Sequence, residues 1–351
     1  MNGIEWQIEM TRYNEIGSEF CKENNGISLP SEIIPNSVSV LSGRTAIDFI
    51  IKDIKAIKKF QTILLPSYCC ESMIEPFLRN EVKVIFYNIG IESIDVDFSN
   101  KCDAILLLDY FGFQCEQITN IAKIAKSKGI IVIYDSTHKI DGNKALDEYM
   151  DYKFCSHRKW YYCNFADVEK FNGNFVIDVP KSFNFEYLSL REKAADLKSE
   201  YILGKDVDKN VFLRLFAEAE ILLESDYVGY AGIKQYYNLN LIKETRRRNA
   251  QILIHELRNL DSIRFWKENL TEDDTPLFFP IFLENSDRNA LRSYLISNGI
   301  YCPIHWPVCK MLKENNQCFK IYDEEISLIC DQRYGAKEME REAYLIKKFF
   351  R

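Results

Sequence analysis

The chain has 351 residues, of which 47% are hydrophobic and 28% charged, and its formal net charge is −7. This length exceeds what one small core organises, so we expect one large domain and a smaller one. The acidic balance excludes a general nucleic-acid binder, which carries a basic face. No apolar run approaches the roughly 20 residues of a membrane span, so we expect no membrane partner.

The cysteines and the first residues of the chain indicate the cellular compartment and whether the chain binds a metal. Eleven cysteines are scattered along the sequence, and the one adjacent pair, Cys69-Cys70, lacks the spacing of zinc ligands. We therefore expect reduced thiols, with no metal site and no disulfide framework. Residues 1–5 lack the basic and apolar parts of a signal peptide, so we expect a cytoplasmic protein.

Strands and helices alternate through the first half of the chain. Residues 1–36 show no strong strand and are expected to form an arm with a short helix within 5–21. Apolar, β-branched runs then predict strands that alternate with amphipathic helices, the pattern of βαβ units and a mainly parallel sheet. The predicted strands are 38–41, 61–66, 82–87, 104–110 and 130–135, and the predicted helices are 43–59 and 116–128.

The pattern changes after residue 159. We expect a strand at 175–179, helical structure over 187–225, whose charged face is most simply solvated, and a helix over 239–257. The last third then predicts strands at 277–283 and 326–330, with helices at 288–298 and 337–350. The domain prediction is an arm over 1–36, a large domain over 37–240 and a small α+β domain over 241–351.

Two stretches carry residues suited to pyridoxal phosphate chemistry. Asp135 ends the apolar strand 130–135, and the carboxyl ends of parallel strands are where open α/β sheets bind ligands. Lys159 follows in Ser156-His157-Arg158-Lys159-Trp160. An acid can keep the pyridinium nitrogen of the cofactor protonated, and a lysine can form its Schiff base. The alternatives are that Asp135 caps a helix and that Lys159 is a solvated surface lysine.

Other polar and aromatic residues have two interpretations each. The Ser42-Gly43 turn at a helix start can bind phosphate through backbone N–H groups, or it can be an ordinary cap. Tyr68 follows a buried strand, where its ring could stack on a planar cofactor or pack in the core. The run Arg246-Arg247-Arg248 could contact phosphate, but a solvated helix face is the simpler interpretation.

Five motifs in one order resemble the DegT/DnrJ-type nucleotide-sugar aminotransferases, a family of fold type I pyridoxal 5'-phosphate (PLP) enzymes. The resemblance spans nearly the whole chain from about residue 16. The motifs are Ser42-Gly43-Arg44-Thr45-Ala46, Tyr134-Asp135-Ser136-Thr137-His138, Ser156-His157-Arg158-Lys159-Trp160, Tyr301-Cys302-Pro303-Ile304-His305-Trp306-Pro307 and Ser327-Leu328-Ile329-Cys330-Asp331-Gln332-Arg333-Tyr334.

The resemblance implies a fold and an activity. The fold would be α/β, with a large domain built on a mainly parallel, seven-stranded-type sheet sandwiched by helices and a smaller C-terminal α+β domain. The activity would be amino transfer from glutamate to a keto-sugar nucleotide, for surface-polysaccharide or amino-sugar biosynthesis. The partners would be these small molecules and a second copy of the chain, in a homodimer with shared active sites.

The resemblance also implies residue roles. Asp135 would bind the pyridine nitrogen, His138 would lie near the ring oxygen, and Lys159 would be the catalytic Schiff-base lysine. Ser156 would contact the cofactor phosphate together with the backbone of Gly43, Arg44 and Thr45, and Tyr68 would stack on the ring. His305 would reach the substrate from the small domain, and Arg333 is a candidate substrate ligand.

The sequence departs from the family pattern in ways that leave alternatives open. The family usually has a glycine pair shortly after the lysine, whereas this chain has Cys163-Asn164-Phe165-Ala166-Asp167. Residues 227–237 fall where a partner subunit would lend groups to the phosphate. Lys139 and Lys153 are rival Schiff-base lysines. Three rival functions remain. The protein could be a PLP enzyme of another reaction type, such as a dehydratase or lyase, a PLP enzyme that acts on an amino acid, or a non-catalytic PLP-fold binding protein.

Overall fold

The computed structural model describes residues 15–22, 36–178, 185–225, 238–283, 287–312 and 318–351 of the chain. Most of the predicted arm and the segment 227–237 lie outside these residues.

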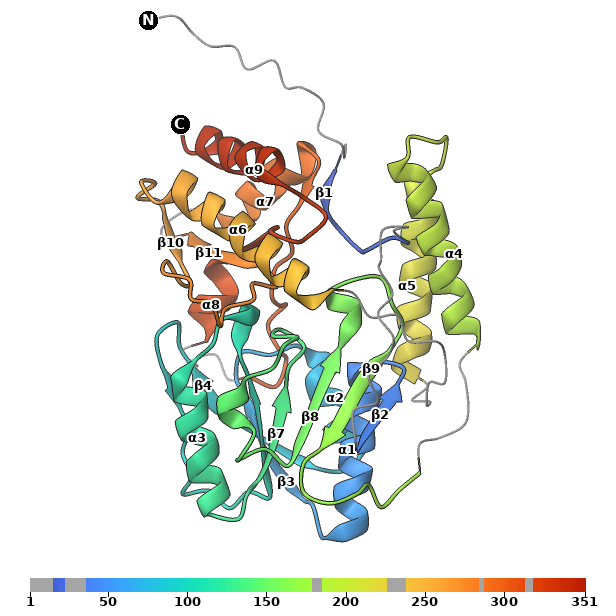
Figure 1. Ribbon diagram of the computed structural model, residues 1–351, viewed down its shortest axis with the longest axis vertical. Coiled ribbons are helices and arrows are strands. Elements are labelled where there is room, and N and C mark those ends of the chain that lie inside the picture. Colours follow the sequence, from blue (N-terminus) through green and yellow to red (C-terminus); the bar gives the residue numbers. More distant parts are fainter. Residues whose placement is uncertain (1–14, 23–35, 179–184, 226–237, 284–286, 313–317) are drawn as a thin grey trace, which may run out of the picture.

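A large eight-stranded sheet forms the centre of the molecule (Figure 1), with strand order β2-β9-β8-β7-β6-β3-β4-β5. The pairs from β8 through β7, β6 and β3 to β4 are parallel, whereas β2, β5 and β9 pair antiparallel with their neighbours. The sequence therefore predicted the mainly parallel sheet correctly. The strands are β2 (Ser37–Val40), β3 (Thr62–Pro66), β4 (Lys83–Ile89), β5 (Ile94–Asp95), β6 (Ala104–Leu108), β7 (Ile131–Asp135), β8 (Tyr152–Ser156) and β9 (Ala166–Lys170).

The parallel strands are apolar because helices cover the sheet. All five residues of β6 are buried, as expected for a strand covered on both faces. Helix α1 (Gly43–Ile57) packs on β8 and β9 and against α2 (Glu71–Arg79), while α3 (Glu116–Ser127) packs on β6 and β7. In the register of the sheet, Leu108 pairs with Asp135 and Asp135 with Phe154. The strands β6, β7 and β8 thus end side by side, and their following loops meet at one edge.

A second, smaller sheet lies above the ends toward which β7 and β8 point (Figure 1). Its three antiparallel strands are β10 (Ile263–Phe265), β11 (Phe279–Leu283) and β13 (Glu325–Leu328). Helix α9 (Ala336–Phe349) contacts both α6 (Leu239–Leu257) and α7 (Arg288–Ser297). The short helix α8 (Phe319–Glu324) precedes β13. The boundary near residue 240 stays a prediction, although this second sheet lies entirely after it.

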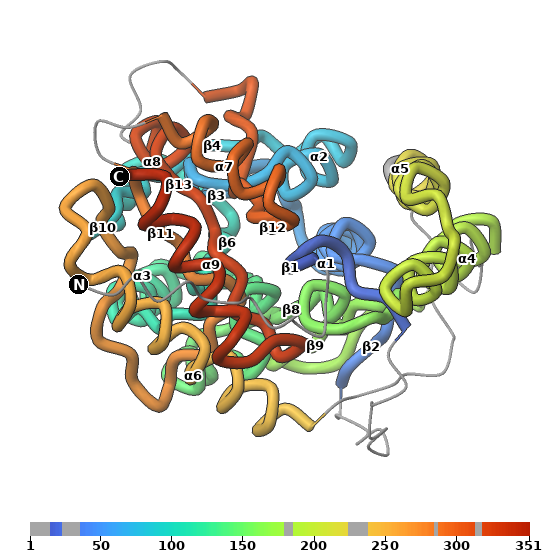
Figure 2. The backbone as a smooth tube through the Cα atoms, turned by 90° about the horizontal axis from the view of Figure 1, so that it is seen from above, coloured from blue at the N-terminus to red at the C-terminus, as the bar shows by residue number. Residues whose placement is uncertain are grey.

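Two further segments connect these parts. Helices α4 (Phe185–Ile202) and α5 (Lys209–Ser225) lie side by side in both views and flank the large sheet near β2 and β9 (Figures 1 and 2). The short strand β1 (Ile16–Gly17) pairs in parallel with β12 (Ile300–Tyr301), so the N-terminal segment reaches the C-terminal part of the chain.

One predicted element is wrong in the described residues, and one is mostly outside them. No strand occurs at 175–178, and the strand lies earlier, at Ala166–Lys170, where paired charged side chains hide its alternation. Residues 16–17 form a strand, because the backbone of β12 supplies their hydrogen bonds, and most of the range 5–21, in which a short helix was predicted, lies outside the described residues. Within the described part of the chain, none of the helices is both long enough and apolar enough to span a membrane.

Candidate active site

Asp135 lies at the carboxyl end of β7 and is buried, with 6% of its surface exposed. Its Oδ1 accepts the backbone N–H of Thr137 at 2.8 Å. Burial raises the pKa of this carboxyl to about 6, against the opposing effects of the Thr137 hydrogen bonds and the charge of Lys159. A carboxylate in this setting gains from a cationic partner and is suited to hold a protonated ring nitrogen.

Lys159 ends the short 3-10 turn η3 (His157–Lys159) that follows β8. Its side chain is exposed and forms no hydrogen bond or ion pair among the described residues. Protein atoms nevertheless surround it, so desolvation and then the charge of Arg158 lower the pKa of the amine, against the carboxylates of Glu19 and Glu220. The charge of Lys159 also acts on Asp135, His138 and His305, so the structure brings these four groups together.

The rival lysines are both in ion pairs. Lys139 is 2% exposed and binds Asp141 at 2.9 Å, and Lys153 binds Glu169 at 2.7 Å. The nearby imidazole of His157 is also engaged, with Asp167 and the Tyr161 hydroxyl each 3.1 Å away. Among the three lysines, Lys159 is therefore the one available for a covalent bond.

Thr137 joins the loop after β7 to the loop that carries Lys159. Its carbonyl accepts the indole N–H of the fully buried Trp160 at 2.8 Å. Its hydroxyl accepts the backbone N–H of Ser156 at 3.1 Å. These two contacts fix residues on either side of Lys159 relative to Asp135.

His138 is buried, and its Nδ1 accepts the backbone N–H of Phe111 at 3.1 Å. Because a backbone N–H only donates, the proton of the neutral ring lies on Nε2. Burial, followed by the charge of Lys159, lowers the pKa of His138 to about 3. The ring is therefore neutral at physiological pH and can donate one hydrogen bond from Nε2.

His305 reaches the site from the segment that follows β12. Its backbone N–H donates to Glu325 at 2.7 Å, and its Nδ1 lies 2.8 Å from the hydroxyl of Ser327. Its ring meets that of His138 edge-on, with centroids 5.8 Å apart. Burial, then His138 and Lys159, hold the pKa of His305 well below its usual range.

The start of α1 faces Ser156. A Cβ placed on Gly43 would lie 3.5 Å from the Cβ of Ser156, so residue 43 and Ser156 are neighbours. Ser42 caps the helix, and its Oγ accepts the backbone N–H of Thr45 at 3.3 Å. The start of the helix, with its orphan donors and positive dipole end, thus lies next to Ser156, an arrangement that suits a phosphate.

Tyr68 is fully buried in a cluster of aromatic rings. Its ring contacts those of Trp306, Tyr110 and Tyr322 at centroid distances of 5.1, 5.3 and 4.9 Å. Its hydroxyl donates to the carbonyl of His305. Tyr68 thus joins the segment of His305 and Trp306 to the large sheet, and its stacking on a cofactor ring stays a prediction.

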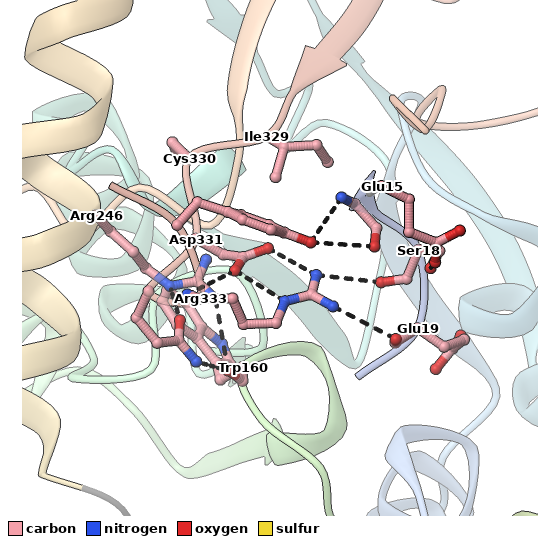
Figure 3. Close-up of polar contacts among 12 residues, drawn as sticks. Glu15, Ser18, Glu19, Trp160, Arg246, Ile329, Cys330, Asp331 and Arg333 are labelled. Carbon is pink, nitrogen blue, oxygen red and sulfur yellow. Dashed lines mark hydrogen bonds and ion pairs between the residues drawn. The ribbon is translucent and has the colours of Figure 1, made fainter. Parts of the chain in front are cut away.

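Arg333 binds protein groups (Figure 3). Two of its nitrogens bind Asp331, at 2.9 and 2.8 Å, and its guanidinium also donates to the carbonyls of Ser18 and Glu19 at 3.2 and 3.4 Å. It therefore holds residues 18–19 against the C-terminal part, and its role as a substrate ligand stays a prediction.

The interpretation of residues 246–248 as a solvated helix face is wrong for Arg246. This side chain is fully buried, donates to the carbonyl of Leu277 and to Gln332, both at 2.7 Å, and lies 4.5 Å from the centre of the Trp160 ring (Figure 3). Arg248 is exposed, as the pattern predicted.

Sequence analysis assigned no role to three charged residues that act on Lys159, which are Glu19, Arg158 and Glu220. It also missed Arg191, whose charge acts on Glu220. Arg44 also binds this group, through Glu220 at 3.4 Å. The position of Arg158 next to the lysine was a usable signal. Glu220 gave none, because α5 has the composition of an ordinary surface helix.

The solved structures that this chain resembles include several aminotransferases. The chain aligns with PseC from Helicobacter pylori, an aminotransferase involved in the biosynthesis of pseudoaminic acid, at 12% identity, covering 96% of this chain and 99% of that chain with a TM-score of 0.65. The PLP form of Spr1654, a putative sugar aminotransferase from Streptococcus pneumoniae, aligns at 11% identity over 95% and 99% of the two chains, with a TM-score of 0.60.

NtdA from Bacillus subtilis, crystallised with bound pyridoxamine phosphate, aligns at 16% identity over 89% of this chain and 73% of that chain, with a TM-score of 0.59. This chain has the fold type I aminotransferase fold. The sequence matches no family model and no curated protein, so the likeness lies in the structure.

Proposed function

We propose that the protein is a PLP-dependent aminotransferase that transfers an amino group to a keto-sugar nucleotide, with glutamate as donor. The observation that carries this proposal is that Lys159, which forms no hydrogen bond or ion pair with the described residues, lies near the buried Asp135 at the carboxyl end of the sheet. The fold shared with sugar aminotransferases supports it.

The residues fit the cofactor in chemistry as well as in position. Asp135 would hold the ring nitrogen, since its carboxylate gains from a cation. The start of α1 with Ser156 would hold the phosphate, and the Nε2–H of His138 would donate to the ring oxygen. When bound, PLP supplies an electron sink that stabilises negative charge on the substrate carbon.

Lys159 would bind the cofactor and then move the proton. A lysine with a lowered pKa is a good nucleophile and, once released, a general base near neutral pH. The neutral rings of His138, from the loop after β7, and His305, from the C-terminal part, would line the site without adding charge. We further propose that the protein is a cytoplasmic homodimer with shared active sites. Its product, an amino-sugar nucleotide, would serve polysaccharide or amino-sugar synthesis.

Borohydride reduction of the PLP-loaded protein tests the assignment of the lysine, because it makes the lysine–cofactor bond permanent. Peptide mass mapping should find the pyridoxyl group on Lys159 in wild type and in the matched variant Lys153→Ala. Labelling of Lys139 or Lys153 instead would refute the assignment. A wild-type protein that takes up no PLP would favour the non-catalytic alternative.

A further inference from the structure

Three residues form a hydrogen-bonded chain that ends at the ring of His305. Nδ1 of His305 lies 2.8 Å from the hydroxyl of Ser327, and this hydroxyl lies 2.5 Å from Oε1 of Glu325. The other carboxyl oxygen of Glu325 accepts the backbone N–H of His305 at 2.7 Å. Glu325 and Ser327 are fully buried residues of β13. We call Glu325, Ser327 and His305 the histidine relay.

The hydroxyl of Ser327 has one proton and two neighbours, so it donates to only one of them. If Glu325 is ionised, its carboxylate only accepts, so Ser327 donates to it and accepts the Nδ1–H of His305. If Glu325 is protonated, it donates to Ser327, and the hydroxyl proton of Ser327 then turns to Nδ1. The proton of the neutral ring thus lies on Nδ1 in the first case and on Nε2 in the second.

The second ring nitrogen of His305, Nε2, is the one left for a ligand. It forms no hydrogen bond within the described ranges of the chain, and the ring lies beside the proposed active site, 5.8 Å from the ring of His138. The ring stays neutral, because burial, followed by the charges of His138 and Lys159, holds its pKa well below the usual range. Its Nε2 is therefore a donor when it carries the proton and an acceptor when it does not.

The surroundings of Glu325 make it the member of the relay that titrates. Burial raises its pKa to about 8, against its hydrogen bonds and the charge of Arg288 on α7. Arg288 donates to the backbone carbonyl of Glu325 at 2.8 Å and keeps its charge throughout. Tyr68, after β3, and Cys302, after β12, have pKa values well above their ordinary ones, so both stay neutral in this range.

We propose that Glu325 and Ser327 are positioning residues that set the tautomer of His305, so that the site offers a ligand a donor when Glu325 is protonated and an acceptor when it is ionised. On ionisation Glu325 releases one proton to water, the Ser327 hydroxyl turns to the carboxylate, and the ring exchanges its Nε2 proton for one on Nδ1. At neutral pH His305 therefore offers Nε2–H, which suits a carbonyl or carboxylate oxygen of a substrate. The inference deepens the proposed function and rests on it only for the identity of that substrate.

Nitrogen-15 NMR of the histidine side chains tests the proposal, because protonated and bare ring nitrogens differ widely in chemical shift. The chain has 4 histidines, so labelling of histidine alone in the full-length protein gives few signals, and loss of a signal in His305→Gln assigns it. Spectra are recorded from about pH 6 to pH 9.5 for wild type, Glu325→Gln and Ser327→Ala. Thermal unfolding checks that each variant folds.

Glu342→Gln is the matched control. Burial raises the pKa of Glu342 to about 8 as well, but its carboxyl binds the thiol of Cys302 at 3.2 Å and the backbone N–H of Ile329 at 3.1 Å, outside the relay. His138 serves as an internal reference, because its Nδ1 accepts a backbone N–H and its proton stays on Nε2 at every pH.

In wild type and in Glu342→Gln, the ring proton of His305 should move from Nε2 to Nδ1 as the pH rises through about 8. Glu325→Gln, whose amide donates to Ser327 at every pH, should keep the proton on Nε2, and Ser327→Ala should show no change near pH 8. A wild-type tautomer that does not change, a change that persists in either relay variant, or one that is also lost in Glu342→Gln overturns the inference. The spectra need no PLP, so if the tautomer changes as expected in a protein that takes up no PLP, the proposed function fails while the relay stands.

Discussion

The backbone N–H of Phe111 donates to Nδ1 of His138 over 3.1 Å, and this bond fixes the proton of the neutral imidazole on Nε2. Phe111 holds this position with a backbone φ of +56°, a left-handed conformation that costs a non-glycine residue roughly 1 kcal/mol. The strained residue thus orients a histidine whose Nε2 carries the ring proton and can donate it in a hydrogen bond.

This geometry predicts different outcomes for two substitutions of His138. Glutamine keeps a donor near the position of Nε2, so His138→Gln should bind PLP within about threefold of wild type. Phenylalanine keeps the ring but no donor, so His138→Phe should lose about tenfold in affinity, the equivalent of roughly 1.4 kcal/mol for one hydrogen bond. Titration of the visible absorbance of bound PLP measures both, and equal affinities for the two variants would contradict the role of His138.

Asp135 should destabilise the cofactor-free protein. Its pKa in the folded chain, about 6, lies above its ordinary value of 3.8. The stability linked to this group is therefore present below pH 4 and lost as the pH rises through 6. In urea unfolding at pH 7.5, the free energy of unfolding of Asp135→Asn should exceed that of wild type by about 1–3 kcal/mol. At pH 4 the two proteins should be equally stable.

The same variant should lose most of its amino-transfer activity, because an amide cannot keep the ring nitrogen protonated. Asp147→Asn, at an exposed position, is the matched control and should change neither property. A variant that is less stable than wild type at pH 7.5 would show that Asp135 is a structural residue.

Two buried acids in the C-terminal part should make the protein less stable as the pH rises into the alkaline range. Burial raises the pKa of Glu325 and of Glu342 to about 8 each, above an ordinary value of 4.5. Their contribution is complete below pH 4.5 and disappears as the pH rises through 8. Urea unfolding between pH 5 and 9 should show a decline in wild type that is weaker in Glu325→Gln and in Glu342→Gln. Glu340→Gln, exposed on the same helix as Glu342, should leave the decline unchanged.

Arg246 and Arg248 should differ sharply although they are two residues apart. Arg246→Met removes a buried cation that satisfies the Leu277 carbonyl and Gln332, so we expect a loss of about 3 kcal/mol in unfolding free energy. Arg248→Met changes an exposed side chain and should stay within about 0.5 kcal/mol of wild type. Equal effects in chemical unfolding would contradict the structural role of Arg246.

The order of the βαβ elements and the placement of Asp135 could be predicted because their signals are local. A buried apolar strand such as β6 or β7 can be recognised in a short window of sequence. The position of Asp135 at the end of β7 can then be read from the same window. The strand Ala166–Lys170 escaped notice because Asp167, Glu169 and Lys170 look like surface residues. Their charges are paired with residues from other elements, such as Asp53 with Lys170 at 2.7 Å.

The charged surroundings of Lys159 could not be predicted for a related reason. Glu220 meets Arg44 across 176 positions and Arg158 across 62, and neither helix pattern nor composition encodes such pairings. The burial of Arg246 likewise depends on Trp160, which lies 86 positions earlier. Sequence alone therefore predicts the position of Asp135 at the end of its strand better than it predicts the charges that surround Lys159.

The central claim is amino transfer through Lys159, and a single-turnover experiment tests it most directly. PLP-loaded protein is mixed with excess glutamate and no acceptor, and the 2-oxoglutarate formed per bound cofactor is counted for wild type and Lys159→Ala. We predict close to one equivalent from wild type and none on the same timescale from the variant. Formation of the keto acid at the wild-type rate by Lys159→Ala, or none by wild type with any common amino acid, would contradict the claim.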